Sequence, residues 1–193
     1  LLLSVRVDNR ARISVRQTFY SVPARYVSRR LWGRLSAGCV EVLDGAKVVA
    51  RHDRALGRSG EVLTLDHYLE VLKVKPGALP GATALVQARL AGAFTGAHQR
   101  YWDAARARYG DKAGTRALIE ILLAHRTLGA AELITAMERA VDTGCLDTAA
   151  VLIDARRAAV PVAAPVVPIG ALSRYDRPAP DLGHYDTLLT GSD

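Results

Sequence analysis

The chain has 193 residues, of which half are hydrophobic and 23% are charged. This composition excludes a disordered protein, because enough apolar surface is present to bury a core. No apolar run approaches the ~20 residues that a membrane-spanning helix needs, and Leu1–Leu3 is too short for the core of a signal peptide. Cys39 and Cys145 are the two cysteines, too few for a disulfide framework or a zinc cluster. We therefore expect a soluble, cytoplasmic protein.

The net charge of +7 is concentrated in the N-terminal third of the chain. Residues 1–60 hold twelve basic and four acidic residues, a net charge of +8, whereas residues 61–157 carry +1 and residues 158–193 carry −2. A concentrated positive field favours a polyanion as partner. The alternative is a solvated arginine face that only keeps the protein soluble, and the charge alone leaves both interpretations open.

Residues 1–58 are expected to form a small basic β-barrel. Apolar and polar residues alternate over residues 3–7 and 13–15, which predicts a hairpin around residues 8–12. Further strands are expected at residues 31–35, 39–43 and 47–51, with Asp44-Gly45 as a tight turn between the last two. About five strands in so short a segment are typical of a small barrel or curled sheet.

The arginines of this segment are the candidate DNA-binding residues. Arginine can hold phosphate oxygens with two hydrogen bonds at once, so a group of arginines fixes a duplex in place without reading its sequence. We expect one group on the polar face of the barrel and another in the connection after Pro23. The first group is Arg6, Arg12, Arg16, Arg34 and Arg51, and the second is Arg25, Arg29 and Arg30.

Residues 61–158 are expected to form an α-helical region after a glycine-bearing linker at residues 57–60. The spacing of apolar residues predicts helices over residues 65–72, 84–94, 98–109, 115–126, 130–141 and 146–158. One stripe would consist of Leu118, Ile121, Leu122 and His125, and the next of Leu133, Ile134, Met137 and Val141. The sequence therefore predicts a two-part α+β fold, a barrel followed by helices.

Residues 159–193 are expected to form a Pro/Ala-rich linker and a docking tail. The prolines at 161, 165 and 168 prevent a helix there. Beyond them, four apolar residues recur in an otherwise acidic tail, which is typical of a docking peptide on a tether. These residues are Leu182, Tyr185, Leu188 and Leu189. The alternative is a disordered tail with chance leucines.

Other kinds of chemistry find little support in the sequence. Gly110–Thr115 lacks the glycine and lysine spacing of a phosphate loop. The histidines at 52, 67, 98, 125 and 184 do not pair at metal-ligand spacing, and none is expected beside a serine or cysteine nucleophile. Some aromatic residues could stack on bases, although single aromatics in strands and amphipathic helices belong more often to the core. They are Tyr26, Trp32, Tyr101 and Trp102.

Several strings of residues resemble one family of transposases. In the N-terminal segment they are Phe19-Tyr20-Ser21-Val22-Pro23, Arg25-Tyr26-Val27, Val40-Glu41-Val42 with Asp44-Gly45, and Val48-Val49-Ala50-Arg51-His52. They are similar to the β-barrel that follows the catalytic core in IstA-type insertion-sequence transposases, relatives of Mu transposase. Further strings resemble that family's helical segment and C-terminal tail: Asp66-His67-Tyr68-Leu69, Lys75-Pro76-Gly77-Ala78-Leu79 and Asp186-Thr187-Leu188-Leu189.

The resemblance implies a transposase that cuts and joins DNA ends through an RNase H-like core with three carboxylates and divalent metal ions. That core would lie upstream of Leu1, so we expect this chain to be the C-terminal part of a longer protein. Asp8, Asp44 and Asp53 are expected at turns or barrel edges, where a pair of metal ions could not be held. We therefore expect a chain that is catalytically silent and has no cofactor of its own, since Mg²⁺ would belong to the core.

The expected function is DNA transposition and integration by a mobile genetic element. The chain would bind double-stranded DNA through its barrel and help transposase protomers assemble on it, in a bacterial cytoplasm and close to the nucleoid. One alternative is a protein-interaction module that recruits an AAA+ helper ATPase or sister protomers. The other is a degenerate remnant of an insertion element without a working partner.

Overall fold

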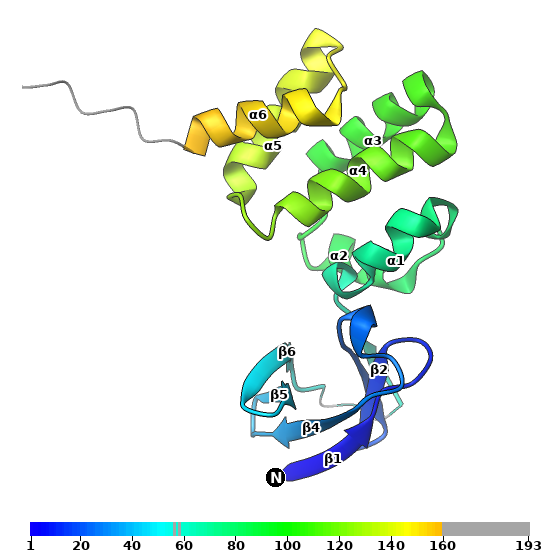
Figure 1. Cartoon of the computed structure of the whole chain (residues 1–193), viewed down its shortest axis with the longest axis vertical. Coiled ribbons are helices and arrows are strands. Elements are labelled where there is room, and N and C mark those ends of the chain that lie inside the picture. Colours follow the sequence, from blue (N-terminus) through cyan, green and yellow to red (C-terminus); the bar gives the residue numbers. More distant parts are fainter. Residues whose placement is uncertain (56, 58, 160–193) are drawn as a thin grey trace, which may run out of the picture. The chain divides into compact units, whose positions relative to one another are not determined.

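The computed structural model describes residues 1–55, 57 and 59–159. In this part of the chain, strands form two sheets within residues 2–62, and six α-helices follow within residues 69–159. Figure 1 colours the strands blue to cyan and the helices green to orange. The expected α+β class is confirmed.

Sheet A is antiparallel and has four strands in the order β1-β4-β5-β6. The strands are β1 (Leu2–Arg6), β4 (Arg30–Leu35), β5 (Cys39–Asp44) and β6 (Lys47–Asp53). β5 and β6 form the expected hairpin, and its turn contains Gly45 with a φ of +60°, a conformation that glycine adopts at little cost because it has no Cβ. Side chains alternate between the faces of this sheet, so Leu31, Val40 and Val42 are buried while their sequence neighbours point the other way.

Sheet B has three strands in the order β2-β3-β7. β2 (Arg12–Val15) and β3 (Thr18–Ser21) are antiparallel, and β7 (Glu61–Val62) runs parallel to β3. Ile13 and Tyr20 of this sheet share one buried cluster with Leu31 and Val42 of sheet A, so both sheets pack on a common core. The expected barrel is not confirmed, because the described residues form two sheets with separate strand orders and no closed ring of paired strands.

The predicted hairpin of residues 3–7 with residues 13–15 is wrong. β1 pairs with β4, and β2 pairs with β3. Asp8 accepts hydrogen bonds from the backbone N–H groups of Arg10 and Arg12, which closes a local turn directly after β1. A second turn at Arg16 and Gln17, both with positive φ, joins β2 to β3. β3 has no clear signal in the sequence, because three of its four residues are buried and no polar alternation marks it as a strand.

Each predicted helix has a counterpart, but the first half of predicted 65–72 is a 3-10 turn and predicted 84–94 ends four residues early, at Leu90. The helices are α1 (Leu69–Val74), α2 (Thr83–Leu90), α3 (Gly96–Tyr109), α4 (Asp111–Ala124), α5 (Ala130–Thr143) and α6 (Thr148–Ala159). Two short 3-10 turns, η2 (Leu65–Tyr68) and η3 (Pro76–Ala78), flank α1. Figure 1 shows α3 beside α4 and α5 beside α6, in agreement with their contacts. None of the helices in residues 69–159 is both long and apolar enough to cross a membrane.

The helices pack on a second buried cluster that is separate from the core of the sheets. Leu118, Ile121, Leu133 and Met137 lie in it, as the two predicted stripes require. Tyr101 is also buried here, and its hydroxyl donates a hydrogen bond of 2.9 Å to the carbonyl of Leu146, which links α3 to the start of the α6 segment. The domain limits predicted at residues 58–61 and 158–159 stay predictions, although strand pairing extends to Val62.

Candidate nucleic-acid interface

The outer face of sheet A carries four of the predicted arginines. Alternation along β4 turns Arg30 and Arg34 to this face, while Leu31 and Gly33 point into the core. Arg6 lies opposite Arg30, and Arg51 lies in the same row as Arg34, separated from it by Glu41 of β5. The sheet therefore brings together side chains that are up to 45 positions apart in the sequence.

The charges on this face are only partly compensated. Arg34 donates a hydrogen bond of 2.8 Å from Nε to Oε2 of Glu41, and the guanidinium of Arg51 lies 3.9 Å from the same carboxylate. Arg6 and Arg30 are directly opposite each other, and neither forms an ion pair within the described part of the chain. Like charges at opposed positions repel each other. An anion bound between the two guanidinium groups would reduce this repulsion.

Arg25 lies in the 3-10 turn η1 (Ala24–Tyr26) that follows Pro23, and Arg29 lies directly before β4. Both guanidinium groups lie over the ring of Tyr26, at 5.1 Å and 5.8 Å from its centroid. Arg29 is 63% exposed and lies 3.6 Å from Asp44, in the turn between β5 and β6. Stacking on Tyr26 restricts two long side chains, which lowers the entropy cost of binding a phosphate group.

The other two predicted arginines lie elsewhere. Arg16 is exposed at the turn between β2 and β3, near Arg54, which the sequence analysis did not single out. Arg12 is largely buried: its guanidinium forms ion pairs with Asp8 and Glu61 and lies 4.4 Å from the centroid of the Phe19 ring. The charge of Arg12 is thus engaged inside the protein, whereas that of Arg16 faces solvent.

Trp32 is one of the aromatic residues for which the sequence left base stacking and burial in the core both open. It lies on β4 between Arg30 and Arg34 and is 47% exposed, so it does not belong to the core. Trp102 is 2% exposed, and its indole N–H donates to the hydroxyl of Thr115, as expected for a core residue. The sequence did contain a signal: Trp32 has the same parity along the strand as its two arginine neighbours.

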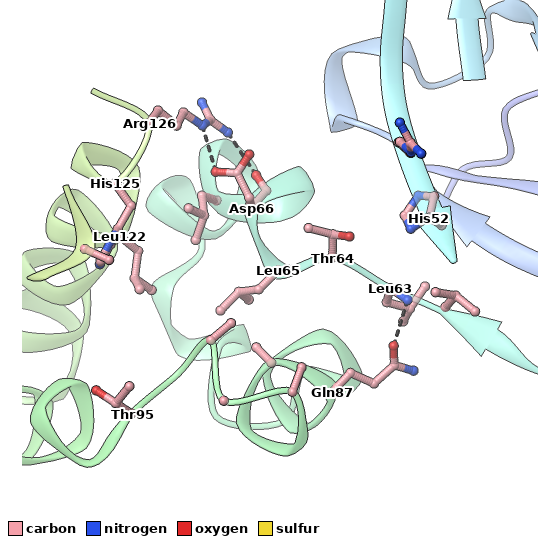
Figure 2. Close-up of a pocket in the computed structure, with 18 of the residues that line it drawn as sticks. His52, Leu63, Thr64, Leu65, Asp66, Gln87, Thr95, Leu122, His125 and Arg126 are labelled. Atoms are coloured by element: carbon pink, nitrogen blue, oxygen red, sulfur yellow. Dashed lines mark hydrogen bonds and ion pairs between the residues drawn. The ribbon is translucent and has the colours of Figure 1, made fainter. Parts of the chain in front are cut away.

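A second feature is a large hollow of about 1040 Å³, lined mostly by residues of the helical region. Figure 2 shows Leu65 within it, with Leu122 and His125 on one side and His52 at the opposite edge. Arg126 borders the hollow and forms ion pairs of 2.6 Å with Glu70 and 2.7 Å with Asp66, which raise its pKa. The charges of these three residues are therefore already paired with one another.

Two histidines beside this hollow contact each other. The Nε2 atoms of His98 and His125 are 3.0 Å apart, and Nδ1 of His98 accepts a hydrogen bond from the backbone N–H of Thr95. Burial, with the neighbouring imidazole as a second cause, lowers the pKa of His98 to about 4. A metal ion would need further ligands, and no group of three metal-ligating side chains occurs among the described residues.

Ser21 and His67 form a serine–histidine pair, which the sequence did not indicate. Oγ of Ser21 lies 2.8 Å from Nδ1 of His67 and accepts a hydrogen bond from the backbone N–H of Thr64. Nε2 of His52 contacts the carbonyl of Ser21 at 2.6 Å. Ser21 has no exposed surface, so no substrate could reach its hydroxyl. The pair joins β3 to η2 and is structural.

The predicted docking residues Leu182, Tyr185, Leu188 and Leu189 lie outside the described residues and stay a prediction. The same holds for the linker and for His184.

Comparison with protein families concerns the N-terminal segment. Residues 2–64 match the model of the Mu transposase C-terminal domain, a segment that spans β1 to β7 and about a third of the chain. No curated protein and no solved structure matches the chain. The match supports a transposase C-terminal region, which is a non-catalytic part of such an enzyme.

Proposed function

We propose that residues 1–62 bind the phosphate backbone of double-stranded DNA without reading its sequence. The observation that carries this proposal is the opposed pair of Arg6 and Arg30, both exposed and without an ion pair in the described residues. Arg34 and Arg51 extend the basic face across the sheet, and the exposed Arg29 directly precedes Arg30 in the chain. Phosphate contacts need only charge and reach, which these long side chains supply.

We further propose that the chain is the C-terminal part of an IstA-type insertion-sequence transposase. The family match over residues 2–64 and the resembling strings support this assignment. In that protein an RNase H-like core would cut and join DNA with its own metal ions. The part described here would be non-catalytic, would need no metal ion and would hold protomers on DNA during transposition, close to the nucleoid.

The helical region is proposed to contact proteins rather than DNA. Residues 61–157 have a net charge of only +1, and two aliphatic side chains in this region, Val74 and Leu90, are 75% and 84% exposed. Such residues favour contacts with sister protomers or with an AAA+ helper ATPase. Light scattering at rising protein concentration tests the first partner, and a Leu90→Glu variant that associates like the parent would contradict a role of this side chain.

The test of DNA binding is a salt titration with a labelled duplex. Replacement of Arg6, Arg30, Arg34 and Arg51 by Gln removes four charges from one face. Each phosphate contact contributes about 0.9 to the slope of log affinity against log salt concentration, so the slope should decrease by about 3.6. Over a fourfold rise in salt the parent should therefore lose roughly 150-fold more affinity than the variant.

A matched variant separates a local interface from the overall charge. Replacement of four exposed arginines of the helices by Gln lowers the net charge by the same amount and leaves sheet A intact. These residues are Arg89, Arg108, Arg156 and Arg157. We expect this variant to keep the slope of the parent. If both variants lower the slope equally, the binding is due to overall charge and the proposed interface is wrong.

A further inference from the structure

The exposed tryptophan of sheet A has no role in binding duplex phosphates. Trp32 lies in the second strand of the sheet, β4, with 47% of its surface exposed to solvent. An indole at such a position leaves a large apolar surface in water, which is unfavourable unless a partner covers it. According to the proposed function, the basic face around Trp32 binds DNA. Trp32 lies within that face, so the same partner could cover the indole.

The surroundings of Trp32 leave the indole accessible. Its direct neighbours across the strands are Ser4 of β1 and Leu43 of β5, and Val48 lies opposite Leu43 on β6. These side chains are small or aliphatic and carry no charge. A depression of about 460 Å³ adjoins the indole and is lined by Leu1, Leu2, Leu43 and Gly45 together with Arg34. A flat apolar group can therefore approach the ring without displacing a charged one.

Positive charge flanks this apolar row on both sides. Arg30 and Arg34 lie two residues before and after Trp32 on the same face, at a spacing of roughly 7 Å per step along the strand. Arg6 lies opposite Arg30 on one side of the apolar row, and Arg51 lies in the row of Arg34 on the other side. An apolar centre between two cationic rows matches a ligand that has flat apolar groups joined by phosphates. An apolar protein partner would leave Arg6 and Arg30, which form no ion pair with residues 1–55 or 59–159, without a counter-charge.

We propose that sheet A binds single-stranded DNA, with a base stacked on Trp32 and phosphates held by the flanking arginines. The inference rests on the proposed function and adds single-stranded DNA as a second form that the same arginines would hold. In a duplex both π-faces of each base are covered by neighbouring bases, so an indole on a sheet surface has access only to an unpaired base. Stacking on aromatic side chains is the usual way in which proteins hold unpaired bases without regard to sequence.

The first test compares Trp32→Ala with the parent on a dT12 oligonucleotide and on a 12-base-pair duplex. Loss of one stacking platform should weaken binding of the oligonucleotide about 5- to 150-fold and leave duplex binding within about twofold. The slope of log affinity against log salt should stay that of the parent, because no charge is removed. Trp32→Tyr, which keeps a π-face, should recover most of the affinity.

Val48→Ala is the matched control, since Val48 is 43% exposed on the same face and cannot stack. It should bind the oligonucleotide like the parent. If Val48→Ala and Trp32→Ala weaken binding equally, general apolar contact is responsible and the stacking proposal is overturned. If Trp32→Ala binds dT12 as tightly as the parent, the stacking proposal is also overturned. Duplex binding is tested separately, by the variant in which Arg6, Arg30, Arg34 and Arg51 are replaced by Gln.

Intrinsic fluorescence gives an independent measure of stacking. The two tryptophans differ sharply, because Trp32 is exposed and Trp102 is buried. Addition of dT12 should quench the tryptophan emission of the parent and have little effect in Trp32→Phe, where Trp102 is the remaining tryptophan. Binding of dT12 without any quenching in the parent would overturn the proposal.

Discussion

Acidification should destabilise the fold between pH 7 and pH 5 because of two buried histidines. Burial, reinforced by the nearby His52 and Arg126, lowers the pKa of His67 to about 4, although Asp66 acts in the opposite direction. Burial and the contact with His125 lower the pKa of His98 to about 4. Both values lie below the ordinary value of 6.5. The unfolded chain therefore takes up protons first as the pH falls.

The size of the effect follows from the two pKa values. The stabilisation from a neutral, buried histidine is fully present above pH 6.5 and is lost as the pH falls toward 4. For one histidine with these values, the loss between pH 7 and pH 5 is about 2 kcal/mol, and for both it is about 4 kcal/mol. That is a large fraction of the stability of a typical domain. Asp8 and Glu70, whose pKa values are lowered, lose their contribution mainly below this range.

The assay is urea unfolding, followed by helical circular dichroism at pH 7, 6 and 5 and constant ionic strength. His98→Gln is the informative variant, because Thr95 and His98 form a capping box at the start of α3 and glutamine is a usual residue at this position of such a box. The variant should lose about 2 kcal/mol less than the parent between pH 7 and pH 5. A parent stability that is constant over this range, or a variant with the parent's pH dependence, would refute the reasoning.

Three further predictions concern the fold and the interface. Gly114→Ala should lower the free energy of unfolding by about 1–3 kcal/mol in urea, because the new Cβ would lie 2.5 Å from the carbonyl carbon of Ala105; unchanged stability would contradict this close approach of α4 to α3. Arg12→Gln should cost roughly 1–3 kcal/mol through the lost ion pairs with Asp8 and Glu61. Its duplex binding should keep the parent's salt slope, and a reduced slope would place Arg12 among the phosphate contacts. Duplex binding should survive EDTA, whereas its loss would show that the interface needs a metal ion.

The helices and one hairpin could be predicted because their signals are local. Amphipathic spacing gave all six helices, and the Asp44-Gly45 pair marked the turn between β5 and β6. Sheet topology could not be predicted in this way. Pairing of β1 with β4 joins Arg6 to Arg30 across a separation of 24 residues, and nothing near either residue specifies the other. Adjacency in the sequence favoured a hairpin there, but the turn built on Asp8 directs the chain into sheet B.

Part of the candidate site was predictable, and part was not. The excess of arginine in residues 1–60 indicated the basic module, but strand register decides which arginines share a face: Arg6, Arg30, Arg34 and Arg51 do, whereas Arg12 is engaged with Asp8. For Trp32 the residue type left stacking and burial both open, although its position between two outward-facing arginines already indicated solvent. The contact of Ser21 with His67 spans 46 residues and has no local signal.

The arginines and Trp32 place different demands on DNA, and this difference separates the two proposals. A guanidinium group can reach a phosphate in any helix, whereas the indole needs an unpaired base. The charge-dependent part of the affinity falls with salt more steeply for a duplex, at about 0.9 per contact, than for a single strand, at about 0.7. With four contacts, a fourfold rise in salt would shift the preference toward single strands by about threefold from charge alone. Stacking on Trp32 adds a preference for single strands that does not change with salt concentration. The contribution of stacking to the affinity is therefore the loss that Trp32→Ala causes equally at every salt concentration.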